Sequence, residues 1–331
     1  MDGVLVDVTN SYRDVTRRSV IEYLCQVLGA DVSDDFITLA DVASVKRKGG
    51  LNNDWDLTDT ILNAYLIKAY HHIDETVLKQ LREVKAAGDD HAVFEQIRRV
   101  QLTIDTAKLE DLVRKQRAPA LFSAAQWSEG DRSPFLLNQG DVQSGNLTKR
   151  IFQELYLGND LFRQIYGEAP IFYCNGGYIE RERMIPTLAQ LDVLSGSYTL
   201  SIATGRPGVE AEYALTQFSI GHYFKTMVSE DNVVEAEREC IESLRKPHPF
   251  SLSLSMEKSG YTSNDSVYYI GDMPDDMVAA GRAQIHPIGF VNGDTEENEE
   301  QKHEHAVLLE HHGASGVFSY FSELISFLKE K

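Results

Sequence analysis

Cysteine, basic side chains and long apolar runs are all scarce in this chain of 331 residues. Its three cysteines, Cys25, Cys174 and Cys240, are far apart and odd in number. This argues against a disulfide framework and favours a reducing compartment, so the cytoplasm is the expected location. No apolar run approaches the roughly 20 residues that a membrane-spanning helix needs, and no membrane partner is therefore expected.

Acidic side chains outnumber basic ones by 51 to 32, which gives a formal net charge of −19. A surface that binds nucleic acid needs a basic stripe facing the phosphate backbone, so this class of function is disfavoured. The same negative charge repels an anionic small molecule at long range. Such a substrate would have to be held by local cations or by a metal ion.

Helical patterns dominate the part of the chain before residue 195. An amphipathic period opens this region, and later stretches are rich in lysine, glutamate, leucine and alanine. Asp56 is a candidate cap for one of the helices, and a long polar stretch over 118–146 is typical of a surface loop. The predicted helices cover residues 10–28, 34–47, 56–72, two or three segments within 74–117, and 147–157.

From about residue 195 the pattern changes to short β-rich runs that alternate with helical stretches. Strands that alternate with helices predict an α/β fold with a doubly wound parallel sheet. The predicted strands are 198–203, 225–228, 267–270 and 286–290. The predicted helices are 209–219, 248–259, 274–283 and 316–329.

Four segments carry residues suited to phosphate chemistry. The first, 1–7, contains Asp2. In the second, a strand ends in Thr204 and Gly205 before a helix, where a hydroxyl and backbone N–H groups can donate to phosphate oxygens. In the third, Lys246 precedes a helix that starts at a proline. In the fourth, Asp272 ends a strand and Asp276 follows one helical turn later, an arrangement of carboxylates that suits Mg²⁺.

Each of these segments has an ordinary structural explanation when it is taken alone. A strand followed by Thr-Gly is often only a turn, Lys-Pro often only starts a solvated helix, and aspartates favour helix N-termini in general. The joint order is what favours a site. Each of the last three segments follows a predicted strand or precedes a predicted helix, which places them together at the carboxyl edge of one sheet, where such sheets bind ligands.

In this order the four segments resemble the motifs of the haloacid dehalogenase superfamily, whose first motif is Asp-x-Asp-Gly-(Val/Thr)-Leu. The resemblance implies a Rossmann-like catalytic core made of residues 1–10 and 195–331. It further implies that residues 11–194 form an α-helical cap inserted between the first and second motifs. The cap is longer than a simple helical bundle, and an extra insert around 74–150 accounts for the excess.

The resemblance also assigns roles to single residues. Asp2 matches the general acid/base that protonates the leaving oxygen and then activates water. Thr204, with Gly205, matches the phosphate-binding position, and Lys246 matches the cation that neutralises charge on the nucleophile and the phosphate. Asp272 matches a ligand of Mg²⁺, and Asp276 matches the second acid of that motif. Asp2, Asp272 and Asp276 are therefore the expected metal-binding residues.

The family's nucleophilic aspartate would stand immediately before Met1, and the first strand of the family's sheet lies just upstream of it. We therefore expect that Met1 is an internal methionine, that the working protein begins further upstream, and that the chain as written is inactive. A catalytically inactive relative is the competing interpretation.

Asp2 helps to choose a reaction, because displacement of halide needs no acid on the leaving group whereas hydrolysis of a phosphate ester does. The sequence thus favours a phosphatase that hydrolyses a small phosphate monoester through an aspartyl-phosphate. A sugar-phosphate mutase of the same fold and a non-catalytic binding protein stay open as alternatives. The expected partner is a small phosphorylated metabolite, and a homodimer is compatible with the sequence.

Substrate choice in such proteins usually lies in the cap, where a loop over 46–55 offers cations, glycines and amides. A solvated turn between two helices explains this loop about as well. Two further arginines, one on the first cap helix and one after Thr-Gly, are candidates to reach an anionic group. The substrate-binding candidates are Arg13, Lys46, Lys48, Gly50, Asn52 and Arg206.

Overall fold

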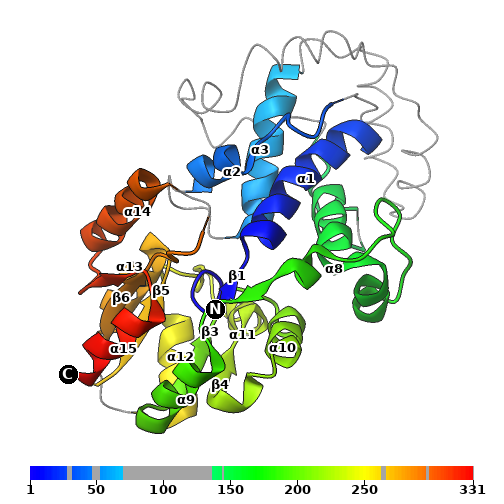
Figure 1. The fold of residues 1–331 in the computed structure, drawn as a ribbon. Coiled ribbons are helices and arrows are strands. Elements are labelled where there is room, and N and C mark those ends of the chain that lie inside the picture. Colours follow the sequence, from blue (N-terminus) through cyan, green and yellow to red (C-terminus); the bar gives the residue numbers. More distant parts are fainter. Residues whose placement is uncertain are drawn as a thin grey trace. The chain divides into compact units, whose positions relative to one another are not determined.

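The computed structural model divides into two compact units (Figure 1). An α/β unit consists of Met1–Val8 and Glu182–Lys331, and a helical unit consists of Thr9–Arg181. Within the described ranges no helix is both long and apolar enough to cross a bilayer, and the three cysteines form no disulfide. The structure describes residues 1–27, 32–46, 53–69, 136–143, 145–261, 266–295 and 298–330.

The helical unit is organised around α1, which packs against α3 and α8. Aromatic rings fill part of its core: Tyr12 stacks on Tyr156, with 4.2 Å between the ring centroids. The described elements are η1 (Thr9–Arg13), α1 (Asp14–Glu22), η2 (Tyr23–Val27), α2 (Leu39–Lys46), α3 (Asp54–Ala69), α8 (Leu147–Tyr166) and η4 (Tyr178–Arg181).

Local capping explains where two of these helices begin. Helix α2 begins at Leu39 instead of 34, because the Asp41 carboxylate accepts hydrogen bonds from the Thr38 N–H group at 2.9 Å and the Thr38 hydroxyl at 2.7 Å. Helix α3 begins before Asp56, the cap expected from the sequence. The Asn53 side chain accepts the Trp55 N–H group at 2.8 Å and so fixes an earlier start.

The other helix predictions for this unit have mixed outcomes. The helix expected over 10–28 is continuous through η1, α1 and η2. Helix α8 extends well beyond 157, to Tyr166, with a kink at Gly158, whose φ is 71°. The helices expected over 74–117, and most of the expected insert, lie outside the described residues.

A buried ion pair fixes α8 to the segment that follows it. The Glu154 side chain is fully buried and accepts the N–H groups of Ile171 and Phe172, at 2.9 and 2.6 Å, as well as the Arg150 Nε–H group at 2.8 Å. Arg150 is only 2% exposed and also donates to the Glu168 carboxylate at 2.9 Å. One carboxylate thus satisfies the backbone groups of a chain reversal that has no strand or helix of its own.

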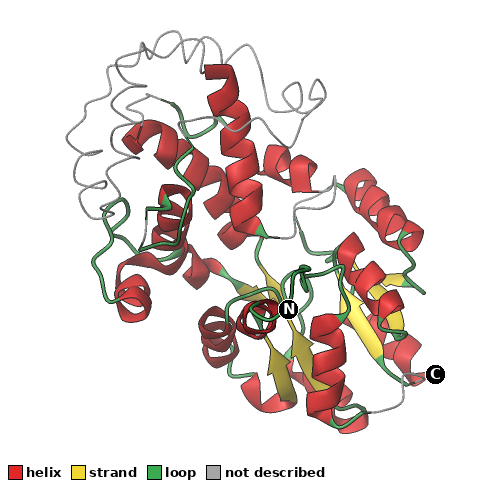
Figure 2. Cartoon of the chain, turned by 180° about the vertical axis from the view of Figure 1, so that it is seen from behind, coloured by secondary structure: helices red, strands yellow, loops and turns green. Residues whose placement is uncertain are grey.

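The α/β unit contains parallel strands in two separate groups, which are seen as yellow arrows in Figure 2. β3 (Leu200–Ala203) pairs with β4 (Phe224–Val228). β5 (Tyr268–Gly271), β6 (His286–Phe290) and β7 (Val317–Phe318) form the second group in that order. The first residues form a short antiparallel ribbon instead, in which β1 (Val6–Asp7) pairs with β2 (Arg183–Met184).

Helices alternate with these parallel strands, which confirms the α/β class. Helix α12 packs on β3 and β4, and α13 packs on β5 and β6. One apolar cluster spans both groups: it includes Ala203 of β3, Leu252 of α12 and Ala280 of α13. The helices are α9 (Leu188–Ser197), α10 (Gly208–Gln217), η5 (Gly221–Tyr223), α11 (Glu230–Glu237), α12 (Phe250–Ser259), α13 (Pro274–Arg282), α14 (Glu299–His311) and α15 (Phe321–Lys329).

Three features of this unit differ from the sequence-based expectation. The single doubly wound sheet is divided into the two groups named above. The unit also resumes at Glu182 instead of residue 195, because β2 pairs with β1 and α9 packs against α15. Finally, β7, α9, α11 and α14 were not predicted, and the helix expected over 316–329 begins only at Phe321, after β7. A strand of two residues carries no alternation to detect, and α14 lies in a stretch dominated by charged residues.

We predict that Glu154→Ala lowers the free energy of unfolding of the helical unit by about 3–5 kcal/mol, because the buried Arg150 keeps only the partly exposed Glu168 carboxylate and the N–H groups of Ile171 and Phe172 lose their acceptor. Urea unfolding followed by circular dichroism measures the change. The control is Asp141→Asn, which alters a 70% exposed partner of Lys149 and should cost less than about 1 kcal/mol. Equal, small losses in both variants would contradict the role given to Glu154.

Candidate active site

The centre of the candidate site is a buried network around Lys246, in the α/β unit. The Lys246 ammonium donates to Asp276 Oδ1 at 2.8 Å and to the Tyr269 hydroxyl, and it lies 3.5 Å from the Ala203 carbonyl oxygen. The Tyr269 hydroxyl is 3.3 Å from that carbonyl and 3.1 Å from Asp276 Oδ1. The carboxyl end of β3, the residues just before α12 and the first turn of α13 therefore meet at one point.

The charges in this network support one another. Burial by itself lowers the pKa of the Lys246 ammonium, but the Asp276 carboxylate and the Tyr269 hydroxyl more than offset this, so that the pKa is raised. Burial by itself raises the pKa of the Asp276 carboxyl, and the positive charge of Lys246 reverses the effect, so that this pKa is lowered. Both shifts favour the ionised forms, and the two residues form a largely buried ion pair at neutral pH, with 17% of the Lys246 side chain and 8% of the Asp276 side chain exposed.

A glycine allows Asp276 to reach this position. A Cβ atom on Gly271 would lie 2.4 Å from Asp276 Cβ, so no larger residue fits at the end of β5. Helix α13 begins immediately afterwards with Pro274, a favoured first residue of a helix. Asp276 Oδ2 accepts the Met273 N–H group at 3.1 Å, which caps the helix and fixes the carboxylate.

A second glycine brings Asp272 against the loop that carries Asp2. Gly3 has a φ of 67°, and a Cβ atom there would lie 2.1 Å from Asp272 Oδ2. From the other side, His305 Nε2 on α14 lies 2.7 Å from the Asp272 backbone oxygen, which holds the end of β5 in place. Asp2 and Asp272, far apart in sequence, are thus neighbours.

Asp2 is held by an arginine that is itself buried. Arg206 Nε donates to Asp2 Oδ1 at 2.5 Å, and the two terminal nitrogens of Arg206 bind both Glu182 oxygens, at 3.0 and 2.9 Å. The Arg206 side chain is 1% exposed and that of Glu182 is fully buried, whereas 33% of the Asp2 side chain is exposed. The buried Arg206 therefore fixes the orientation of the Asp2 carboxylate, while a third of the Asp2 side chain stays exposed.

Thr204 and Gly205 follow β3, as expected. Thr204 is buried, its N–H group donates to the Val228 oxygen at 2.9 Å, and its Oγ1 accepts the Arg206 N–H group at 3.1 Å. The N–H group of Gly208, the first residue of α10, donates to Asp231 at 3.0 Å. Open space lies beside Gly205 where a Cβ would stand. A phosphate-binding site here would therefore use the Thr204 hydroxyl and the Gly205 backbone. The Gly208 N–H group at the start of α10, which the sequence suggested as a further donor, is already bound to Asp231.

The residues fit a Mg²⁺ ion that takes few protein ligands. Over the residues that the structure describes, no three histidine, cysteine or acidic side chains gather at metal-ligand spacing, but Mg²⁺ is commonly bound by one or two carboxylates plus substrate oxygens. The close approach of Asp272 to Gly3 places a carboxylate directly against the Asp2 loop. Both Asp276 oxygens and Asp2 Oδ1 have protein partners, so their assignment as metal ligands stays a prediction.

The structure separates the predicted substrate residues into three groups. Arg13 lies half-buried at the end of η1, and Lys46 pairs with Asp54 at 2.8 Å; both belong to the helical unit. Arg206 does not fit the role of a substrate ligand, because its guanidinium is buried against Asp2 and Glu182. The remaining candidates, Lys48, Gly50 and Asn52, lie outside the described residues.

Three residues of the site were not predicted as such: Glu182, Tyr269 and His305. Glu182 lies in a stretch assigned to the cap, and only the folded chain brings it to Arg206. Tyr269 stands in the same motif as Asp272, where an aromatic residue in a strand normally indicates core packing. His305 lies in an acidic helical stretch. None of these positions has a local sequence signal that separates it from an ordinary structural residue.

The comparison with known proteins finds a family match over the part of the chain that contains Thr204, Lys246 and Asp272. Residues 180–290 match the family of haloacid dehalogenase-like hydrolases. No curated protein matches the chain. A crystal structure from the Northeast Structural Genomics Consortium is similar, with a TM-score of 0.64 and 20% identity over 100% of this chain and 97% of that one. This similarity shows a shared fold.

Two further solved structures are more distant. A phosphatase from Thermococcus thioreducens has 18% identity and a TM-score of 0.49 over 93% of this chain and 96% of its own. A putative beta-phosphoglucomutase from Thermotoga maritima has 17% identity and a TM-score of 0.44 over 100% and 96%.

We predict that Arg206→Met lowers the free energy of unfolding by about 3–5 kcal/mol, because the Glu182 carboxylate stays buried without its guanidinium partner. The double variant Arg206→Met/Glu182→Leu should recover at least about 1 kcal/mol of this loss, since it also removes the buried carboxylate. Arg245→Met is the control: its pairs with Glu230 and Glu237 are made by a side chain 42% exposed, and its loss should stay below about 1 kcal/mol. Additive losses in the double variant would refute the pairing.

Proposed function

We propose that this protein, whose residues 180–290 match the family of haloacid dehalogenase-like hydrolases, is a Mg²⁺-dependent phosphatase that acts on a small phosphate monoester. The observation that carries the proposal is the convergence of Asp2, Thr204, Lys246 and Asp272 at the carboxyl ends of β3 and β5. These residues come from four distant parts of the chain. Arg206 binds both Asp2 and Thr204, and Gly3 brings the Asp2 loop against Asp272. Lys246 lies against the end of β3 at the Ala203 carbonyl.

The proposed reaction has two steps. In the reaction that the family's chemistry implies, an aspartate carboxylate attacks phosphorus, the bond from phosphorus to the ester oxygen breaks, and Asp2 gives its proton to the leaving oxygen. Water, deprotonated by the Asp2 carboxylate, then attacks the phosphorus of the acyl phosphate and releases inorganic phosphate. The nucleophile is thereby restored. Asp2 suits both steps because its backbone loop and Arg206 fix its position while a third of its side chain is exposed.

The remaining residues of the site would bind and neutralise the phosphate group. The Thr204 hydroxyl and the Gly205 backbone are placed to donate to its oxygens. The Lys246 ammonium would be shared between Asp276 and the nucleophile. Mg²⁺, held by Asp272 and the loop of Asp2, would supply a positive charge to offset the charge on the transferring phosphate. In a chain with a net charge of −19, such local positive charges are needed to hold an anionic substrate.

The presence of Asp2 favours phosphate esters over haloacids within this family. A departing halide needs no proton, and a buried arginine–glutamate pair that orients an acid would then serve no purpose in catalysis. A leaving alkoxide does need one, and proton transfer from a positioned acid typically contributes about 10²–10⁴-fold to the rate. A small phosphorylated metabolite is the substrate class that this chemistry accepts.

We predict that Asp2→Asn lowers kcat by about 10²–10⁴-fold, because an amide cannot exchange the proton. The measurement is the release of inorganic phosphate from a panel of sugar phosphates and other small monoesters, by the protein with an aspartate before Met1. Asp275→Asn is the control, since it makes the same change at a carboxylate in the first turn of α13 to which no step of the reaction is assigned, and it should leave kcat close to the unsubstituted value. A folded protein that hydrolyses no monoester would contradict the proposal, and an isomeric phosphate as product would indicate a mutase instead.

Removal of Mg²⁺ provides an independent prediction. A chelator should abolish phosphate release, and added Mg²⁺ should restore it, because Asp272 then again has its cation. Asp272→Asn should raise the Mg²⁺ concentration needed for half-maximal activity. Activity that survives full chelation would contradict the assigned role of the metal.

A further inference from the structure

One face of α14 is anchored to the rest of the α/β unit, in a stretch of mostly charged residues. Lys302, His305 and Leu309 are three and four residues apart, so they share this face of the helix. Lys302 Nζ donates to the Gly293 oxygen at 2.6 Å, and Leu309 is fully buried in an apolar cluster with Met277 of α13. His305 stands between these two contacts and is 9% exposed. Its position is therefore fixed from both sides.

The His305 ring holds the backbone carbonyl of Asp272. Nε2 of the ring lies 2.7 Å from the Asp272 oxygen. Because a carbonyl oxygen can only accept a hydrogen bond, Nε2 carries the proton and donates it. Both the neutral ring in this tautomer and the imidazolium have that proton, so the contact does not require a charged histidine. The Asp272 carbonyl is thus constrained from the side of α14.

The other end of the same peptide group is held from α13. The peptide that begins with the Asp272 carbonyl ends at the Met273 nitrogen, whose N–H group donates to Asp276 Oδ2 at 3.1 Å. A peptide group is planar, so contacts at its two ends fix its orientation. On the preceding side, Gly271 is paired with Gly289 in the sheet. The backbone of Asp272 is therefore fixed before and after its Cα atom, and with it the direction of the Cα–Cβ bond.

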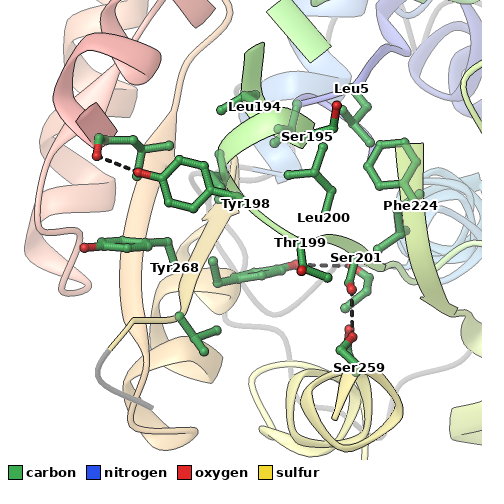
Figure 3. Close-up of a pocket in the computed structure, with 18 of the residues that line it drawn as sticks. Leu5, Leu194, Ser195, Tyr198, Thr199, Leu200, Ser201, Phe224, Ser259 and Tyr268 are labelled. Carbon is green, nitrogen blue, oxygen red and sulfur yellow. Dashed lines mark hydrogen bonds between the residues drawn. The ribbon is translucent and has the colours of Figure 1, made fainter. Parts of the chain in front are cut away.

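These contacts matter because one flank of β5 borders a cavity (Figure 3). Among the described strands β5 pairs with β6, whereas Tyr268 and Ile270 line a cavity of about 740 Å³. A cavity supplies no contact atoms to the strand that lines it. The orientation of the residues that follow β5 therefore depends on the contacts from α13 and α14.

The Asp272 carboxylate that is held in this way faces the loop of Asp2. A Cβ atom on Gly3 would lie 2.1 Å from Asp272 Oδ2, so the two segments touch. Mg²⁺ requires nearly ideal octahedral geometry, and the side chains of such a site must be held within about 0.5 Å of the productive position. A carboxylate whose backbone is fixed at both ends meets this requirement.

We propose that His305 is a positioning residue for Mg²⁺ binding: together with Asp276 it holds the peptide group between Asp272 and Met273 and so directs the Asp272 carboxylate. This inference rests on the role given to Asp272 in the proposed function. A simpler role, in which His305 satisfies the carbonyl at the end of a strand, predicts a loss of stability without a change in cation affinity. Removal of a residue that orients a metal ligand typically lowers metal affinity by about 10–100-fold.

The test compares three variants of the full chain. His305→Gln keeps an N–H donor near the position of Nε2, His305→Met has a similar length and no donor, and His303→Met changes an exposed residue of the same helix. Mg²⁺ alone is titrated while the amide signals of Gly3 and Met273 are followed by NMR. We expect the Kd for Mg²⁺ to rise by about tenfold or more in His305→Met and to stay close to the unsubstituted value in the other two. Without metal, exchange of the Met273 amide should become about tenfold faster in His305→Met alone.

The outcomes separate this inference from the proposed function. An unchanged Kd for Mg²⁺ in His305→Met, with folding verified by circular dichroism, refutes the positioning role. So does an equal loss of affinity in His305→Gln or in His303→Met, because the donor would then not be the cause. If no form binds Mg²⁺, including the unsubstituted chain, the metal in the proposed function is refuted instead. Exchange of the Met273 amide then decides by itself: a difference between the two His305 variants supports the hold on the peptide, and equal rates refute it.

Discussion

The buried contact between the Lys246 ammonium and the Asp276 carboxylate is the constraint on which the candidate site depends. It joins residues just before α12 to the first turn of α13, and through Tyr269 and the Ala203 carbonyl it reaches the ends of β5 and β3. Taking two charges out of water is costly, and the cost is offset only where further hydrogen bonds satisfy both groups. Here the Met273 N–H group and the Tyr269 hydroxyl supply such bonds.

Charge balance in the site follows from these pairings. Each basic group that could attract phosphate already has an acidic partner: Lys246 has Asp276, and Arg206 has Asp2 and Glu182. The positive charges of Lys246 and Arg206 are thus partly neutralised by these carboxylates before a phosphate group binds, in a protein whose net charge is −19. This explains why a metal ion at Asp272 is an essential part of the proposed chemistry.

The sequence predicted those features that leave a local pattern. The alternation of strands and helices after residue 195 and the order of Thr204, Lys246 and Asp272 are visible in the chain itself, and the α/β class is confirmed. The environment of Arg206 is not visible, because its partners Glu182 and Asp2 stand 24 and 204 residues away. Division of the sheet into two groups could not be predicted either, since strand pairing depends on long-range contacts that no periodicity encodes.

The most direct test of this account is a double-mutant cycle of Lys246→Met and Asp276→Asn, read as the free energy of unfolding. If the two side chains form the buried contact that unites the site, their coupling should be at least about 1.5 kcal/mol, and the double variant should be more stable than the sum of the single losses implies. Losses that add within about 0.5 kcal/mol would mean that the two residues do not meet, and the account of the site would be wrong.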